Sequence, residues 1–314
     1  MKVILVNEPG GIDKLIYAEL TIPAINDDEV LVQVKAISIN PVDVKSRAGK
    51  GVFGRLKDEL PLILGWDISG IVKQAGSNAG FKKGDEVFGM VNFPGHGKAY
   101  AEYVAAPASH LAIKPANITH AEAAAATLAA LTAYQAIAHK ANVKQGQNVL
   151  IHAASGGVGH YAVQIAKHLG AEVTGTSSAK NKDFVVSRGA DHHIDYHGYN
   201  WAESTNEYDF IFDTIGGDNI DNSLEVAKSG STLISIPTGL NEAVTEKAKA
   251  KGVNGYFFMV SSNGDDMKVL AEWLEKGIIK SHVSETFDFK DMALAHEYVE
   301  SGRTVGKIVV TLSI

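Results

Sequence analysis

The chain has 314 residues, of which 45% are hydrophobic and 21% charged, the balance of a folded chain long enough for two domains. Its net charge is −7 and no run of Lys or Arg stands out, which argues against nucleic-acid or membrane partners. There is no cysteine, so disulfides, thiolate nucleophiles and cysteine-ligated metals are excluded. The short apolar run that ends before Asn7 predicts neither a signal peptide nor a membrane span, and we expect a cytoplasmic protein.

Residues 1–120 predict a mainly β domain. Short β-rich segments broken by Gly, Asn and Pro cover 3–7, 28–40, 67–76, 84–91 and 101–107. Apolar residues alternate from Val30 to Ala36, so one face of that strand is expected to be buried. The composition then changes to an alanine-rich stretch, 119–141. This stretch predicts one helix with Thr119 as N-cap and Glu122 completing a capping box.

Residues 121–260 predict a parallel, doubly wound sheet. Strand patterns at 148–154, 171–178, 208–217 and 231–237 alternate with helical patterns. The last segment, 261–314, contains a helix near 264–279 and a closing strand near 306–314. Composition alone does not decide which domain this last segment joins.

A glycine-rich bend, Ala154-Ser155-Gly156-Gly157-Val158-Gly159, connects the first of these strands to a helix. Small residues here let a pyrophosphate approach backbone N–H groups at the positive end of the helix, which is how dinucleotides are bound. The alternative is a tight strand-to-helix turn that needs no ligand. His152, within the strand, is interpreted as a buried core histidine.

The next strand end favours NADP(H) over NAD(H). An NAD site places an acidic residue about twenty positions after the bend, but this chain has Gly175, Thr176, Ser177 and Ser178, followed by Lys180. Hydroxyls and a lysine would accept a 2′-phosphate that an acid would repel. Alone, Lys180 could be an ordinary exposed lysine at a helix start.

The motifs NPVD (40–43), GDEVFGM (84–90), AYAEYV (99–104), LTAYQAI (131–137) and GKIVV (306–310), together with the bend, resemble the medium-chain dehydrogenase/reductase superfamily. Within it the chain is similar to the zinc-free quinone oxidoreductases related to zeta-crystallin and to the plant alkenal and enone reductases. The resemblance implies a GroES-like substrate domain at 1–120, a Rossmann domain binding NADP at 121–260, and a return of 261–314 to the substrate domain. It also implies a homodimer or homotetramer.

The resemblance further implies that no metal is bound. The positions of the catalytic zinc ligands carry Asn40, Trp66 and Leu128, none of which can hold Zn²⁺. The paired His192 and His193 would point to opposite faces of a strand, so a shared ion is not expected. A reductase without a Lewis acid needs acceptors that take hydride readily, namely quinones or α,β-unsaturated carbonyls. The alternatives are an enoyl-thioester reductase of the same superfamily and a non-catalytic dinucleotide-binding or structural protein.

Candidate site residues follow from these expectations. As catalytic residues we predict Asn40, a donor near nicotinamide or substrate unless it is only a turn residue before Pro41, and Lys45, a donor to an enone oxygen unless it is a surface lysine. The cofactor-binding set is Thr127, Gly156, Gly157, Val158, Ser178, Lys180, Tyr196, Ile215, Ile236, Pro237 and Lys307. The substrate-pocket set, in which each residue could equally be core, is Phe53, Trp66, Phe93 and Phe258.

Overall fold

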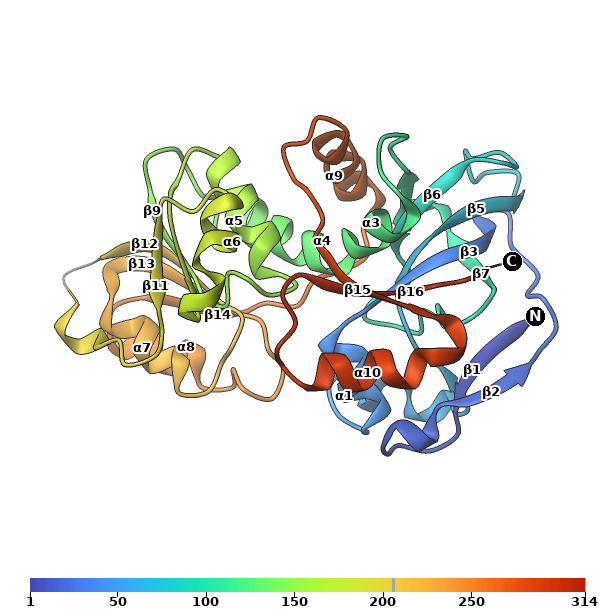
Figure 1. The fold of residues 1–314 in the computed structure, drawn as a ribbon, viewed down its shortest axis with the longest axis horizontal. Helices are drawn as coiled ribbons and strands as arrows, with labels where there is room; N and C mark the ends of the chain where they lie inside the picture. The colour runs from blue at the N-terminus through green and yellow to red at the C-terminus, as the bar shows by residue number, and fades with distance from the viewer. Residues whose placement is uncertain (205–206, 314) are drawn as a thin grey trace. The chain divides into compact units, whose positions relative to one another are not determined.

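The computed structural model describes residues 1–204 and 207–313 and divides into two compact units (Figure 1). The first unit comprises Met1–Leu131 together with the chain from Val260 onward, and the second comprises Thr132–Met259. The last segment is therefore part of the first unit. The sequence placed the first boundary at residue 120, whereas the structure places it at Leu131, because the helix after Thr119 packs on the first unit's sheet.

The first unit is built around a seven-stranded sheet with the order β15-β16-β3-β5-β6-β8, in which β7 pairs with β3. β15 and β16 are parallel, and the other neighbours are antiparallel. A small sheet, β2-β1-β4, completes it. Its elements are β1 (Lys2–Val6), β2 (Ile16–Glu19), β3 (Glu29–Ile39), α1 (Pro41–Arg47), α2 (Phe53–Leu56), β4 (Leu62–Ile63), β5 (Asp67–Ala75), β6 (Glu86–Met90), β7 (Tyr103–Pro107), β8 (Leu111–Ile113), α3 (His120–Ala125), α9 (Gly264–Glu275), β15 (Val283–Asp288), α10 (Met292–Glu300) and β16 (Lys307–Thr311).

The apolar alternation in β3 buries Val30, Val32, Val34 and Ala36 completely, as the sequence predicted. α3 lies over this sheet, and its Ala124 packs with Ala36 in one buried cluster. Alanine side chains let the helix approach the strands closely, which stabilises the unit by removing apolar surface from water.

The prediction of one helix over 119–141 is wrong. The chain forms α3, then α4 (Leu128–Tyr134), then a π-helix (Gln135–Lys140). Two hydrogen bonds explain the break: the Thr127 hydroxyl donates to the Ala124 carbonyl at 2.8 Å, and the Leu128 N–H donates to the buried Asp67 carboxylate at 3.0 Å. A backbone donor that the helix would otherwise use is therefore bound to the neighbouring strand.

The second unit is a six-stranded parallel sheet with the order β11-β10-β9-β12-β13-β14. Helices α5 and α6 pack on β9, β10 and β11, and α7 and α8 pack on β12, β13 and β14 (Figure 1). This is the doubly wound arrangement that the sequence predicted. The elements are β9 (Asn148–Ile151), α5 (Gly159–His168), β10 (Glu172–Ser177), α6 (Lys182–Ser187), β11 (His192–Asp195), β12 (Tyr208–Asp213), α7 (Asn219–Glu225), β13 (Ala227–Ser235), α8 (Val244–Ala250) and β14 (Asn254–Phe257).

Across residues 1–204 and 207–313, no helix combines the length and the apolar character that a membrane crossing requires.

Candidate functional site

A buried polar cluster surrounds Asn40, where β3 ends and α1 begins. The Asn40 amide donates from Nδ2 to Asp67 Oδ2 at 2.8 Å, and its Oδ1 accepts from Lys307 Nζ. Lys307 also donates to the Ile39 carbonyl at 3.1 Å. Asn40, Asp67 and Lys307 are each no more than 3% exposed. β3, β5 and β16 are neighbours in one sheet, so these three side chains meet although they are far apart in sequence.

The electrostatics of this cluster are set by burial. Burial raises the pKa of Asp67, while the Lys307 ammonium opposes that rise. Burial also lowers the pKa of Lys307, opposed by Asp67 and Asp43. Burial, followed by the charge of Asp67, raises the pKa of Asp43 to about 7. The cluster holds two carboxyl groups against one ammonium, so at neutral pH Asp43 is partly protonated.

A series of polar side chains leads from this cluster to the surface of the unit. Asp43 accepts from the Asn40 N–H at 2.7 Å, and Tyr100 lies close enough to Asp43 to influence its pKa. The Tyr100 hydroxyl contacts His296 Nε2 at 2.8 Å. Arg47 contacts the other ring nitrogen of His296 at 3.2 Å and pairs with the partly exposed Glu300 at 2.6 Å.

The sequence reasoning did not predict that Asp43, Arg47, Tyr100 and His296 lie together. Tyr100 and His296 belong to the AYAEYV motif and to the last helix, which carry no spacing signal that links them. Only the tertiary structure brings α1, α10 and the segment before β7 together.

The two predicted catalytic residues, Asn40 and Lys45, lie in different surroundings. The Asn40 Nδ2 group has two N–H donors, of which one is bound to Asp67 at 2.8 Å and the other lies 3.4 Å from the Ser38 carbonyl. To donate to another molecule, Asn40 would have to exchange the longer of these two bonds. Lys45 is half-buried on α1, and burial, together with the nearby charge of Lys50, lowers its pKa. Thr127 and Lys307, predicted to bind cofactor, lie at this cluster, with Thr127 beside Asp67.

The predicted pocket aromatics fall in two classes. Trp66 and Phe93 are 1% and 7% exposed and form an edge-to-face pair with ring centroids 5.3 Å apart. The Trp66 indole also donates to the Gly95 carbonyl at 2.6 Å, so both rings serve the core of the first unit. Phe53 and Phe258 are only partly buried, each in a different unit.

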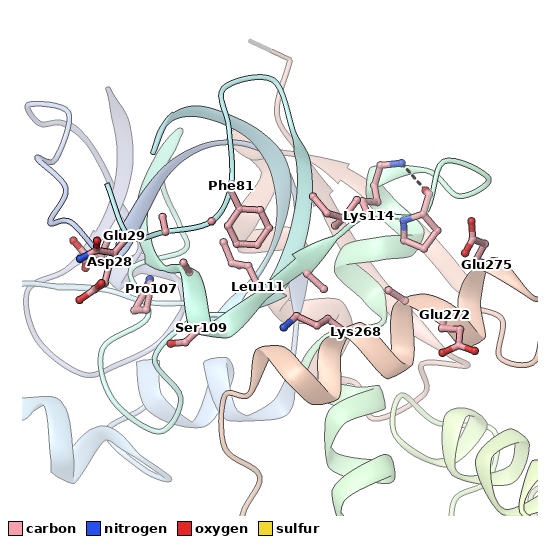
Figure 2. A pocket seen from close by; sticks show the side chains of 18 of the residues that line it. Asp28, Glu29, Phe81, Pro107, Ser109, Leu111, Lys114, Lys268, Glu272 and Glu275 are labelled. Carbon is pink, nitrogen blue, oxygen red and sulfur yellow. Dashed lines mark hydrogen bonds between the residues drawn. The ribbon is translucent and has the colours of Figure 1, made fainter. Parts of the chain in front are cut away.

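One groove of the first unit, of about 1320 Å³, lies between the loops around β8 and helix α9 (Figure 2). Phe81 and Leu111 form part of its floor, and Lys268, Glu272 and Glu275 line the helix side. The Lys114 ammonium is bound to the Pro115 and Ile118 carbonyls at 3.0 and 2.7 Å. None of the predicted catalytic, cofactor or pocket residues lines this groove.

In the second unit, the predicted cofactor residues follow the carboxyl ends of parallel strands. Gly156, Gly157 and Val158 follow β9, Ser178 and Lys180 follow β10, and Tyr196 follows β11. Ile215 follows β12, while Ile236 and Pro237 follow β13. Carboxyl ends of parallel strands share one edge of the sheet, and that edge is where doubly wound sheets bind ligands.

The glycine bend turns sharply from β9 into α5. Ala153 adopts a left-handed backbone with φ 48°, and the chain turns directly into α5. A Cβ on Gly159 would lie 2.1 Å from the Ala153 carbonyl oxygen, so only glycine lets α5 start this close to β9. Gly156 and Gly157 are partly exposed. Backbone N–H groups at a glycine bend before a helix suit a pyrophosphate.

The part of this edge that was predicted to hold the 2′-phosphate contains no acidic residue at the end of β10. Ser178 begins the single turn Ala179–Asn181, and Lys180 is exposed on that turn. The Asn181 amide donates to Ser155 at 3.2 Å, which ties the turn to the glycine bend. Tyr196 is 51% exposed and stacks on His197, with the rings 4.1 Å apart.

Buried Asp213, at the end of β12, organises the next part of the edge. Its carboxylate accepts from the Ile215 N–H at 3.0 Å, from the Gly216 N–H at 3.0 and 3.1 Å, and from Ser235 at 2.7 Å. The sequence reasoning did not identify Asp213. The only signal was an aspartate directly after an apolar strand, followed by two glycines.

His152 is a buried core histidine, as predicted. It is 1% exposed, and its ring contacts Thr176 and Ser223 at 3.3 and 3.1 Å. Burial lowers its pKa to about 4, although the charge of Asp213 opposes this, so it is neutral at pH 7.

Within the described part of the chain, no three His, Asp or Glu side chains gather closely enough to hold a metal ion. His192 pairs with Glu172 at 2.9 Å and His193 contacts Ser177 at 2.7 Å, so the two rings of this pair have different partners.

Two family models match the chain. "Alcohol dehydrogenase GroES-like domain" covers residues 26–116, and "Zinc-binding dehydrogenase" covers residues 188–310. Among curated relatives, the 2-methylene-furan-3-one reductase of Solanum lycopersicum is 35% identical, over 96% of this chain and 76% of the relative. The chloroplastic NADPH-dependent alkenal/one oxidoreductase of Arabidopsis thaliana is 36% identical, over 99% and 79% respectively.

Among solved structures, the quinone oxidoreductase from Coxiella burnetii superimposes with a TM-score of 0.94 at 34% identity, covering 100% of this chain and 99% of that one. The likeness therefore covers both units, at an identity well above what a shared fold alone requires. The chain belongs to the medium-chain dehydrogenase/reductase superfamily, in its group of zinc-free quinone oxidoreductases and alkenal reductases.

Proposed function

We propose that this protein is an NADPH-dependent, zinc-independent reductase that transfers hydride to quinones or α,β-unsaturated carbonyl compounds. The observation that carries the proposal is the carboxyl edge of the parallel sheet. A glycine bend opens α5 there, and Ser178 and Lys180 stand where an NAD site would have an acid. The relatives named for alkenal, enone and quinone reduction support the same activity.

The residues of the second unit fit the dinucleotide. Because Gly159 has no Cβ, α5 begins directly against the Ala153 carbonyl oxygen, which a Cβ would overlap at 2.1 Å. We expect a pyrophosphate to bind the backbone N–H groups at this end of α5. Ser178, Lys180 and Tyr196 would hold the 2′-phosphate through hydroxyls and one positive charge. Bound NADPH supplies the hydride, and the protein supplies position and electrostatics.

The first unit supports metal-free chemistry. The resemblance assigns Asn40, Trp66 and Leu128 to the positions of the zinc ligands in the zinc-dependent members, and none of the three is a zinc ligand type. Asn40 is instead bound to Lys307 and Asp67. Without a metal to polarise a carbonyl, a conjugated acceptor is needed, because its developing charge spreads onto an oxygen that hydrogen bonds can stabilise. Lys45, half-buried on α1, is the proposed donor to that oxygen.

A steady-state assay tests the proposal. Oxidation of NADPH is followed with an ortho-quinone, a 2-alkenal and a simple saturated ketone, each with and without a chelator. We expect turnover with the conjugated acceptors, none with the ketone, and no effect of the chelator. Inhibition by the chelator would contradict the metal-free mechanism, and NADPH binding without oxidation by any acceptor would favour the non-catalytic alternative.

Two further expectations belong to this proposal: a homodimer or homotetramer, and a cytoplasmic location. Light scattering on the purified protein measures the assembly, and a mass equal to one chain of 33.4 kDa would contradict the first. Fractionation of the source cells tests the second.

A further inference from the structure

A histidine lies directly behind the proposed 2′-phosphate site. His193 is half-buried on β11, and its Nε2 contacts the Ser177 hydroxyl at 2.7 Å. Ser177 donates in turn to the Ser178 carbonyl at 3.1 Å, and its own carbonyl accepts from the Tyr196 N–H at 3.3 Å. A connected path of hydrogen bonds therefore joins this imidazole to two residues of the proposed phosphate site.

The pairing of the strands explains why His193 reaches this position. β10 and β11 are parallel, with Gly175 opposite His193 and Ser177 opposite Asp195. A Cβ on Gly175 would lie 2.6 Å from Val185 and 2.8 Å from Ala154, so this face of the sheet lies under α6 and beside the glycine bend. Residue Ser177 is on the same face because side chains alternate along a strand.

The charged groups around this imidazole are few. Burial lowers the pKa of His193, Asp195 opposes that change, and Lys182 on α6 adds to it. The neighbouring charges on the packed elements are paired: His197 with Asp195 at 2.8 Å, His192 with Glu172 at 2.9 Å, and Lys167 with Asp191 at 2.5 Å. Among the described residues, these carboxylates are therefore paired with other side chains, and none forms a salt bridge with His193.

We propose that His193 is a specificity-determining residue for the 2′-phosphate, positioning Ser177 and Ser178 and taking up a proton when NADPH, but not NADH, binds. The inference rests on the proposed NADPH site. Because Ser177 donates to Ser178, its oxygen accepts from the Nε2–H of neutral His193, and the added proton goes to Nδ1. A dianionic phosphate nearby favours the imidazolium, so preference for NADPH increases as the pH falls towards 6.5.

Proton uptake is measured by titration calorimetry of the full-length protein with NADPH and NADH in buffers of different ionisation enthalpy at pH 7. We expect NADPH to take up about half a proton and NADH none. The ratio Kd(NADH)/Kd(NADPH) should rise about fivefold from pH 8 to pH 6.5. A His193→Gln variant keeps a donor to Ser177 but cannot titrate, so its NADPH complex should release a small fraction of a proton from the phosphate, and its ratio should not rise.

The matched control is His192→Gln, the neighbouring residue on the opposite, exposed face of β11, which should behave like the unmodified protein. If NADPH binds more tightly than NADH but without proton uptake, or if His193→Gln takes up as much, the inference is wrong and the proposed cofactor stands. If NADPH binds no more tightly than NADH at any of these pH values, the proposed NADPH site itself is wrong. Loss of uptake in both His variants would also overturn the assignment to His193.

Discussion

Three buried residues, Asn40, Asp67 and Lys307, form a connected polar cluster in the first unit. A buried ion pair contributes little when compared with an apolar replacement, but removing one partner leaves the other charge unsolvated. Lys307 is the only one of the three that brings a positive charge, and it is 3% exposed. Its loss therefore leaves the Asn40 Oδ1 without its donor and removes the nearby positive charge that favours the ionised Asp67 carboxylate.

We predict that Lys307→Met destabilises the protein by about 3–5 kcal/mol, because Asp67 stays buried without a counter-charge. Urea unfolding monitored by fluorescence measures the change. Lys268→Met is the matched control, since the Lys268–Asp265 pair at 2.8 Å is exposed and should leave the unfolding midpoint unchanged. Equal midpoints for the two variants would show that the Lys307 ammonium does not compensate the buried carboxylates.

Buried histidines also predict how stability depends on pH. Burial lowers the pKa of His296 to about 3 and that of His152 to about 4, against 6.5 when exposed. At these two sites the unfolded chain thus binds protons that the folded chain does not, so the contribution of the two histidines to stability is fully present above pH 6.5 and is lost as the pH is lowered towards 4. Asp43, with its pKa raised to about 7, and Asp67, whose pKa burial also raises, act in the opposite sense, because the folded chain holds protons there that the unfolded chain releases.

We predict that His296→Gln flattens this dependence. Between pH 6 and pH 4.5 its free energy of unfolding should change by about 1.4 kcal/mol less per pH unit than that of the unmodified protein, the equivalent of one proton. Denaturant unfolding at several pH values provides the measurement, with the exposed His192→Gln as control. An unchanged slope in His296→Gln would mean that His296 is not held neutral in the folded state.

At the scale of elements, the glycine bend fixes the distance between β9 and α5. Gly159 allows the helix to begin against the Ala153 carbonyl, and a Cβ would overlap that oxygen. The bend, the turn after β10 and the loop held by Asp213 all lie at one edge of the sheet. Displacing α5 therefore alters the site as well as the packing.

We predict that Gly159→Ala lowers stability by about 1–3 kcal/mol and weakens NADPH binding more than tenfold, because α5 must move away from β9. Thermal unfolding and a fluorescence titration with NADPH measure the two effects. A suitable control is Gly54→Ala, since a Cβ there meets nothing within 4 Å. Full NADPH affinity in Gly159→Ala would show that the close approach of helix and strand is not needed for the site.

The helices and strands also show which parts of the fold could be predicted from the sequence and which could not. Strand and helix periodicity predicted the parallel sheet and the bend, because these depend on local pattern. The break of the helix at Thr127 could not be predicted, since its cause is a hydrogen bond to Asp67, which is distant in sequence. The Tyr100–His296 contact was missed for the same reason.

At the scale of the whole molecule, two units contribute different chemistry. The second unit contains the strand ends and the glycine bend that we propose bind NADPH, and the first contains the buried polar network around Asn40. No single motif was enough to assign the family, because each could also be an ordinary turn, surface or core feature. The assignment rests on both units together. The central claim is that hydride passes from NADPH directly to a conjugated acceptor without a metal.

The most direct test of that claim uses NADPH deuterated at the transferring position of C4 and a 2-alkenal, with the product analysed by mass spectrometry and NMR. The account predicts a saturated aldehyde with one deuterium on the carbon β to the carbonyl. Deuterium on the carbonyl carbon of an allylic alcohol, or a reduced product with no deuterium, would contradict it.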